Sequence, residues 1–114
     1  MKLAPFDVVV VPFPYTDRTA EKRRPALVVS APALQQKFGL VWLLMITSAD
    51  NRAWGCDVAV SDLAAAGLPA PSVVRPAKIA TVDADRILRR AGRLTAKDTA
   101  AVKAAIKKLS GMEP

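Results

Sequence analysis

Histidine is absent from the 114-residue sequence, and cysteine occurs once, as Cys56. Histidine is the commonest metal ligand and the usual general base near neutral pH, so its absence argues against a metal centre. The phosphate-binding patterns G-x-x-x-x-G-K-[ST] and G-x-G-x-x-G are also missing. We therefore expect no metal and no cofactor, and any chemistry must use arginine, lysine, hydroxyl groups and carboxylates.

Apolar runs long enough to cross a membrane are missing too. Residues 8–11 and 41–46 fall far short of the roughly 20 residues that span a bilayer. A lone cysteine cannot form an internal disulfide, and no secretory leader precedes the first strand. A sequence with 52% apolar residues can build one core, so we expect a single domain over residues 1–114. From the cysteine count and the short apolar runs, we expect a cytoplasmic chain without a membrane partner.

Positive charge is what the sequence has in excess. Seventeen Lys and Arg against ten Asp and Glu give a formal net charge of +7, which on a small body attracts polyanions. The cations gather at residues 18–24, 86–93 and 103–108 instead of spreading evenly. Cations spread evenly over the surface would indicate only that they keep the protein soluble, whereas clustered cations indicate nucleic acid as a partner.

Short β-branched and aromatic segments bounded by turn residues predict a mainly β protein. A long polar loop over residues 15–23 joins the first two strands, and a turn-rich stretch covers residues 47–55. Pro76 interrupts the fifth strand region. The predicted strands are residues 6–13, 26–30, 40–46, 56–60, 72–78, 79–82 and 87–94.

Two helices are predicted. Ser61 or Asp62 can cap a brief helix through residues 64–66, which Gly67 would end in the left-handed conformation. Thr95 opens a C-terminal helix, and one face of it is apolar at the spacing i, i+3, i+4, i+7. We expect a twisted antiparallel sheet that curls into a partly open barrel, with short helices and a C-terminal helix packed on it.

Five segments in order carry a resemblance to a known family. They are F-D-V-V-V-V-P-F-P-Y-T-D at residues 6–17, R-R-P-A-L-V-V-S at 23–30, M-I-T-S at 45–48, A-G-L-P-A-P-S-V-V-R-P-A-K-I-A-T-V-D at 66–83 and R-I-L-R-R-A-G-R-L at 86–94. Together they resemble the MazF/PemK/Kid toxins of type II toxin–antitoxin systems, over nearly the whole chain. Each segment alone is weak, but their order and spacing are specific.

The resemblance implies an SH3-like, partly open barrel of the MazF/CcdB kind, a homodimer, and metal-independent, sequence-specific cleavage of single-stranded mRNA. In that reaction the ribose 2′-OH attacks the adjacent phosphate and leaves a 2′,3′-cyclic phosphate and a 5′-OH. The enzyme must stabilise charge on the phosphorane and protonate the departing oxygen. A cognate acidic antitoxin would silence the toxin by competing with RNA for a basic groove.

Arg24 and Thr47 match the family's catalytic positions. A guanidinium offers a planar fork of donors to phosphate oxygens, and Pro25 biases Arg24 toward an extended conformation. The Thr47 hydroxyl could donate to a non-bridging oxygen, with Ser48 assisting from the next position. Without the resemblance, a surface arginine and a turn-capping threonine would be the simpler interpretation.

Further side chains are candidates for RNA contacts. Trp54 lies in the turn-rich stretch and could stack a base, as could Tyr15, whereas Trp42 lies in an apolar strand and is expected in the core. Arg23 should leave the strand on the side opposite Arg24. The RNA-binding candidates are Arg18, Lys22, Arg23, Ser48, Trp54, Arg75 and Lys78.

The sequence also departs from Kid. Kid has an acidic residue two positions after its arginine, where this chain has Ala77, and a histidine where this chain has Arg18. Arg75 therefore either binds RNA or pairs with a carboxylate. The general base is open, with Asp17 and Glu21 as candidates that could equally be solvated charges. Thr81 and Asp83 are expected to tie a turn through side-chain bonds to the backbone.

Two other functions fit the same barrel. One is a poison of DNA gyrase like the CcdB branch, and the other is a non-catalytic barrel that binds nucleic acid. The pair Arg24 and Thr47 argues against the gyrase poison, because that branch does not use it to cleave phosphodiesters.

Overall fold

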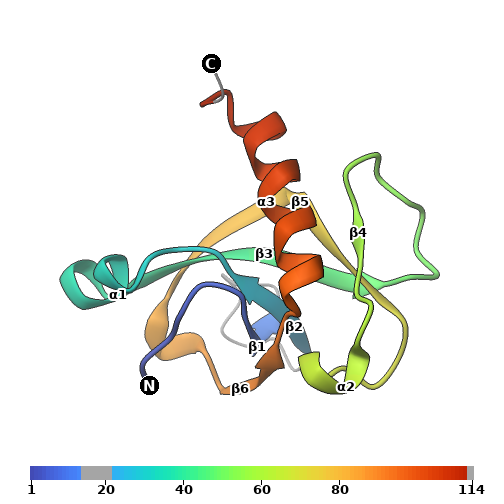
Figure 1. The fold of residues 1–114 in the computed structure, drawn as a ribbon. Coiled ribbons are helices and arrows are strands. Elements are labelled where there is room, and N and C mark those ends of the chain that lie inside the picture. Colours follow the sequence, from blue (N-terminus) through green and yellow to red (C-terminus); the bar gives the residue numbers. More distant parts are fainter. Residues whose placement is uncertain (14–21, 113–114) are drawn as a thin grey trace.

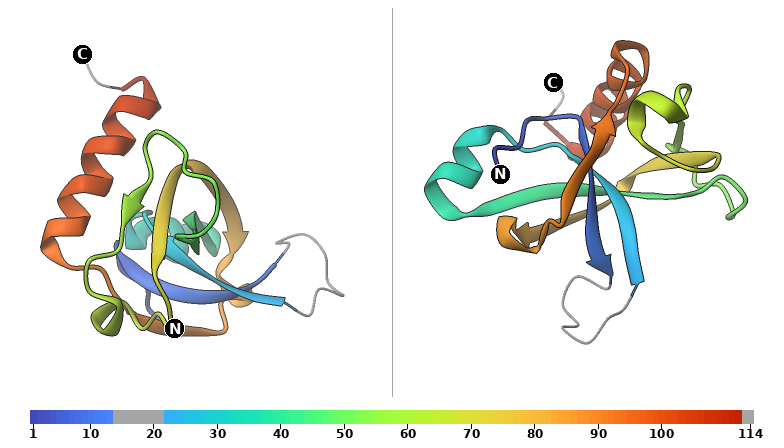
Figure 2. Two further views of the ribbon diagram at one scale, coloured as in Figure 1. Left: turned by 90° about the vertical axis from the view of Figure 1, so that its right-hand side faces the viewer. Right: turned by 90° about the horizontal axis from the view of Figure 1, so that it is seen from below.

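In the part of the chain that the structure describes, residues 1–13 and 22–112, six strands form one antiparallel sheet in the order β4-β5-β3-β2-β1-β6. The structure is a computed structural model, and its sheet curls into a half-open barrel (Figures 1 and 2). The strands are β1 (Asp7–Phe13), β2 (Lys22–Val28), β3 (Leu40–Ser48), β4 (Val58–Ala59), β5 (Ser72–Asp83) and β6 (Arg89–Arg93). The helices are α1 (Pro32–Phe38), α2 (Leu63–Ala66) and α3 (Ala96–Ser110), with a 3₁₀ turn, η1 (Ala84–Arg86).

The central strands are buried on both faces, which explains their nearly continuous apolar runs. Val9 and Val11 of β1 face one core cluster with Leu43 of β3. Val8 faces the other cluster, in which Val102 of α3 covers the sheet. Figure 1 shows α3 lying across the sheet near β5. The predicted C-terminal helix and its packing on the sheet are confirmed.

Strand β2 begins earlier than the sequence predicts. Pairing with β1 starts at Lys22, opposite Phe13, and runs through Arg24, opposite Val11. The last two residues of the predicted loop over residues 15–23 therefore belong to the strand, because cross-strand pairing extends past the apolar segment into charged residues. Lys22, Arg23 and Arg24 are thus all held on a strand that pairs with β1.

Strand β5 is continuous where the sequence predicts two strands. Its register against β3 shifts between Ile79, opposite Leu44, and Arg75, opposite Met45. The three residues between them, which include Pro76, have no partner on β3. Proline cannot donate to the ladder, so the irregularity falls where the sequence places the interruption.

The short helices have clear end signals. The Asp62 carboxylate accepts a bond from Ala65 N at 3.0 Å, and Gly67 ends α2 in the left-handed region at φ 71°, as predicted. Thr95 caps α3 by accepting from Asp98 N at 3.3 Å. Helix α1 is not predicted, because it buries none of its residues and so lacks an apolar periodicity.

Two predictions about β3 and β5 are wrong. Trp42 is 46% exposed, although it shares a face of β3 with the buried Leu44, because it lines the open groove beside α3 instead of lying under the helix. An apolar strand does not reveal how far a helix from a distant part of the sequence will cover it. Asp83, within the described residues, precedes η1 without a side-chain capping bond, so it does not tie that turn.

A carboxylate fastens the edge strand β6 to β1. Asp7 is buried, and its oxygens accept bonds from Arg93 Nη1 at 2.7 Å and Arg90 Nε at 3.0 Å. Its Oδ2 also accepts from Ala4 N at 2.9 Å. The three bonds satisfy a buried charge that would otherwise be costly. Two cations of the 86–93 cluster therefore serve the fold.

Two glycines let α2 and β6 approach closely. A Cβ on Gly92 would lie 2.3 Å from the Ala65 carbonyl oxygen, and one on Gly67 would lie 2.0 Å from that of Ala91. These are backbone atoms that cannot swing aside. The next residue after Gly67 is Leu68, so this contact fixes where the segment after α2 runs.

We expect Gly92→Ala to destabilise the fold by about 1–3 kcal/mol, because the added methyl forces α2 away from β6. Thermal unfolding followed by circular dichroism measures the loss. Gly55→Ala is the matched control, since a Cβ there meets nothing within 4 Å. Equal melting temperatures for the two variants would show that α2 can move at no cost.

Candidate functional site

The strand pair β2 and β3 brings Arg24 and Thr47 together. Their pairing ends at Ala26 opposite Met45. Continuing that register by two residues on each strand would set Arg24 across from Thr47, but the ladder stops beside Pro25, which has no N–H to donate. A pocket of about 180 Å³ opens there, and both side chains line it.

The wall of this pocket comes from the segment after α2. Leu68 and Pro69 line it together with Ile46 of β3. The close approach of α2 to β6 thus fixes the position of Leu68 and Pro69 on one wall of the pocket. The ends of β2 and β3 form the other wall. The residues lining the pocket are Arg24, Pro25, Ile46, Thr47, Ser48, Leu68, Pro69, Ala70, Pro71 and Ser72.

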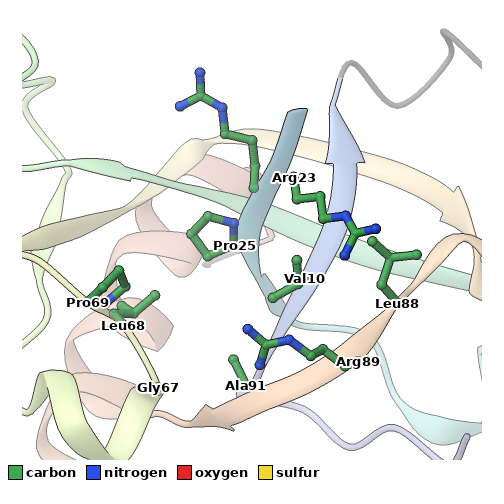
Figure 3. A pocket seen from close by; sticks show the side chains of 10 residues that line it. Val10, Arg23, Pro25, Gly67, Leu68, Pro69, Leu88, Arg89 and Ala91 are labelled. Atoms are coloured by element: carbon green, nitrogen blue, oxygen red, sulfur yellow. The ribbon is translucent and has the colours of Figure 1, made fainter. Parts of the chain in front are cut away.

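A second, larger pocket of about 330 Å³ adjoins the first and shares Arg24, Pro25, Leu68 and Pro69 with it. Figure 3 shows Leu68 and Pro69 on one side of Pro25, and Leu88 and Arg89 on the other. Its described lining residues are Val10, Arg23, Arg24, Pro25, Gly67, Leu68, Pro69, Leu88, Arg89 and Ala91.

The two pockets are electropositive. Three arginines line them, Arg23, Arg24 and Arg89, and none of the described residues that line them is a carboxylate. Cations on low-dielectric walls concentrate the field, so the pockets attract anionic groups such as phosphates. Arg89 was not singled out by sequence, although the cation cluster at residues 86–93 contains it.

Arg24 is half-buried and held over an aromatic ring. Its Cζ lies 5.6 Å from the centroid of Phe13, two residues along β1 from its cross-strand partner Val11. No carboxylate of the described residues forms an ion pair with Arg24. A guanidinium fixed by stacking and left without an anion is suited to bind a phosphate.

The opposite faces expected for Arg23 and Arg24 on β2 stay a prediction from strand alternation. Arg24 alone of the two reaches the pocket with Thr47, while both line the larger pocket. Lys22 is exposed at the start of the strand.

Thr47 and Ser48 are both held by the turn that follows β3. The Thr47 Oγ1 accepts a bond from Asn51 Nδ2 at 2.5 Å, which leaves the hydroxyl hydrogen available to donate. Ser48 Oγ accepts from Asp50 N at 3.1 Å, so Ser48 also shapes the turn. The sequence did not single out Asn51, and its only signal is a position four residues after Thr47.

Arg75 does not line these two pockets and is engaged elsewhere. Its Nε and Nη2 donate to Asp57 at 3.1 and 2.9 Å, and Nη2 also donates to the Arg52 carbonyl at 2.8 Å. The side chains of Arg75 and Asp57 are only 11% and 8% exposed. Of the two predicted roles, pairing with a carboxylate is the one observed.

The other predicted residues lie apart from the pockets or beyond the described residues. Lys78 is exposed in the irregular part of β5 and lines neither pocket. Trp54 stacks on Arg75, with 4.3 Å between the Arg75 Cζ and the ring centroid. Arg18, Tyr15 and the general-base candidates Asp17 and Glu21 fall within residues 14–21, outside the described part of the chain.

Residues 1–13 and 22–112 contain no group of three His, Cys, Asp or Glu side chains that could hold a metal ion. Among the same residues, no helix is both long and apolar enough to cross a membrane.

Comparison with known proteins decides the family. The model of PemK-like, MazF-like toxins of type II toxin–antitoxin systems matches residues 4–110. The chain belongs to this toxin family. The predicted resemblance is confirmed, since the match covers nearly all of the sequence. A search of curated proteins finds no match.

Solved structures show the same fold. MazF (Form-I) from Deinococcus radiodurans superimposes with a TM-score of 0.77 at 23% identity, covering 98% of this chain and 99% of that one. The Mycobacterium tuberculosis toxin MazF-mt6 has a TM-score of 0.71 at 24% identity, covering 90% and 93%. An endoribonuclease in complex with its cognate antitoxin, from a mycobacterial species, has a TM-score of 0.73 at 20% identity, covering 96% and 94%. The predicted mainly β, MazF-like barrel with a C-terminal helix is therefore confirmed.

The pair Arg75 and Asp57 makes stability depend on acid pH. The hydrogen bond from Arg75 is the main cause that lowers the pKa of the Asp57 carboxyl, with help from the Trp54 N–H and against the effect of burial. The same hydrogen bond to the Asp57 carboxylate raises the pKa of the Arg75 guanidinium. Because the folded pKa of Asp57 lies below its unfolded value of about 3.9, its contribution is complete above that pH and is lost below it.

We expect Asp57→Asn to lower the melting temperature at pH 7 by several degrees, and this difference from the unsubstituted protein to shrink as the pH falls below about 4. Melting curves from pH 2.5 to 7 measure it. Asp50→Asn, at an exposed carboxylate of the same loop, should change little at any pH. A constant gap across the whole range would mean that the charge of Asp57 does not matter.

Proposed function

We propose that this toxin is a metal-independent endoribonuclease that cleaves single-stranded mRNA at specific short sequences. The observation that carries the proposal is the pocket shared by Arg24 and Thr47, which adjoins a second pocket lined by Arg23 and Arg89. A guanidinium without an anion and a hydroxyl with a hydrogen to donate are the groups needed to bind a phosphate.

In the proposed reaction, the substrate's own 2′-OH attacks the neighbouring phosphorus and the bond to the 5′ oxygen breaks. The products are a 2′,3′-cyclic phosphate and a 5′-OH. Arg24 donates to the non-bridging oxygens and stabilises the charge that builds on the phosphorane, and the Thr47 hydroxyl donates to the same group. Asn51 holds Thr47 in the orientation for this bond.

The proton of the 2′-OH needs an acceptor, and the leaving 5′ oxygen needs a donor. No described residue lining the pocket is a carboxylate, so the acceptor is not assigned among them. Asp17 and Glu21 stay candidates within residues 14–21. Arginine is a poor base, because its pKa exceeds about 12.

The larger pocket would take the phosphates next to the cleaved one. Arg23 and Arg89 line it on either side of Val10, so successive phosphates of an RNA strand would meet successive cations. Lys22 at the start of β2 would add long-range attraction, as would Arg18 and Lys78. Ser48 lines the smaller pocket beside Thr47 and would assist there.

We expect Arg24→Ala to lower the cleavage rate about 100- to 1,000-fold while preserving the fold, because it removes the main donor to the developing charge. Gel analysis of a long RNA in EDTA, with chemical mapping of the product ends, measures it. Thr47→Val should also lose activity, and Thr47→Ser should keep most of it.

Lys37→Ala is the matched control, since it removes an exposed cation in the last turn of α1 that lines neither pocket. Full activity in a folded Arg24→Ala variant would remove Arg24 from the mechanism. If the unsubstituted protein left RNA intact but trapped DNA gyrase, the CcdB-like alternative would hold, and binding without cleavage would favour the non-catalytic barrel.

We also propose a cognate antitoxin as the partner of this chain in the cytoplasm. Structures of similar toxins include MazE–MazF complexes from Deinococcus radiodurans. The cationic pockets around Arg24 favour an acidic, extended antitoxin segment that competes with RNA for the same site.

We also propose a homodimer, for which an apolar surface beside α3 is suited. Trp42, Ile79 and Leu109 are all substantially exposed, and they line an apolar groove of about 420 Å³ between α3 and the irregular part of β5. The groove contains no charged residue among its described lining. A second copy would bring the same apolar surface to a two-fold axis, which makes the contact self-complementary and places no cation against another.

We expect Ile79→Glu to weaken the dimer at least about tenfold, because it buries a charge in an apolar contact. Sedimentation of the purified protein over a range of concentrations measures the dissociation. Phe38→Glu, at an exposed apolar residue at the end of α1, is the control and should leave it unchanged. A monomeric unsubstituted protein, or a dimer that tolerates the charge at Ile79, would refute this interface.

A further inference from the structure

The segment between β3 and β4 is built around one tryptophan. Trp54 N donates to Asp57 Oδ2 at 2.9 Å, and Asp57 N donates to the Trp54 carbonyl at 3.0 Å, which closes a tight turn. The beginning of the segment is tied to the strand after α2, since Ala49 N donates to the Pro71 carbonyl at 3.0 Å. The backbone at Trp54 is therefore fixed at both ends.

The indole of Trp54 is supported from one side. The Arg75 guanidinium lies 4.3 Å from the ring centroid, a cation–π distance. Arg75 Nε and Nη2 donate hydrogen bonds to Asp57, and Nη2 also donates to the Arg52 carbonyl. These bonds fix the guanidinium in place against the ring. Asp57 thus positions both the backbone of Trp54 and the cation against its ring.

Despite this support, Trp54 remains 37% exposed. A tryptophan that served only to fill the core would bury more of its surface. A tryptophan that served only to cover the ion pair would gain little from a fixed backbone and a fixed ring. An exposed ring with one face occupied and its position fixed is preorganised for a flat partner, because little conformational entropy remains to be lost on binding.

We propose that Trp54 stacks on an RNA base and that Arg75 and Asp57 are the positioning residues that hold it in place. The inference rests on the proposed ribonuclease function and adds a base contact outside the cleavage pocket. Trp54 is seven positions after Thr47, so their Cα atoms lie within roughly 25 Å of each other and one RNA strand can reach both. Arg75 supports recognition without touching a phosphate.

A base is the favoured partner because single-stranded nucleic acid presents unstacked aromatic faces beside the phosphates that the cationic pockets attract. The stacking term is largely insensitive to salt, whereas contacts to phosphate are not. This difference separates the role of Trp54 from that of the arginines around Arg24.

The test uses the full chain with Trp42→Phe, in which Trp54 is the sole tryptophan, because the sequence has two. A single-stranded oligonucleotide with 2′-O-methyl riboses lacks the attacking hydroxyl and is bound without cleavage. We expect it to quench Trp54 fluorescence. In otherwise unsubstituted protein, Trp54→Ala should weaken binding about 5- to 150-fold, Trp54→Phe should bind nearly normally, and the slope of log affinity against log salt should not change.

Two matched variants complete the design. Arg23→Ala removes a cation from the larger pocket, so it should reduce the salt slope by about one and leave the Trp54 quenching intact. Asp57→Asn should weaken binding with the salt slope unchanged, because it loosens the ring and not a phosphate contact. Cleavage of natural RNA by the unsubstituted protein is measured in parallel.

Unquenched Trp54, or normal affinity in folded Trp54→Ala, would overturn the stacking role while RNA cleavage by the unsubstituted protein upheld the proposed function. A Trp54→Ala variant with a lower melting temperature but normal RNA affinity would also overturn the stacking role, because the ring would then only cover the ion pair. A change in antitoxin binding alone would assign the ring to a protein partner and also overturn the proposal. Failure of the unsubstituted protein to bind and cleave RNA would overturn both.

Discussion

The point at which β2 and β3 separate is the constraint on which the rest of the site depends. The ladder runs to Ala26 and Met45 and stops next to Pro25, so Arg24 and Thr47, two positions beyond the last pair, face an opening instead of each other's backbone. Had the ladder continued, Arg24 and Thr47 would lie on a closed sheet. A proline beside an arginine therefore creates the pocket and supplies its cation at once.

The placement of carboxylates divides the arginines into two groups. Asp7 engages Arg90 and Arg93, and Asp57 engages Arg75, so these three cations hold strands and turns together. The arginines that line the pockets have no carboxylate among the described lining residues. With ten acidic residues for seventeen basic ones, the sequence leaves an excess of cations, and the fold concentrates part of that excess at one place.

Local patterns predict much of this fold because their signals lie within a few residues of each other. The cap at Asp62, the glycine after α2 and the apolar face of α3 are examples. Features that depend on distant segments were not predicted: the exposure of Trp42 beside α3, and which carboxylate pairs with Arg75, an aspartate 18 residues away. The pair Arg24 and Thr47 came from family resemblance, since nothing local joins two residues on different strands.

The glycine contact between α2 and β6 has a consequence for how the toxin family can vary. Leu68 and Pro69 follow directly from Gly67 and line both pockets, and their position depends on the contact of α2 with Gly92 of β6, which lines neither pocket. Inheritable loss of toxicity thus need not alter any group that faces the pockets. A single methyl at Gly92 could silence the protein while every residue that lines the pockets stayed unchanged.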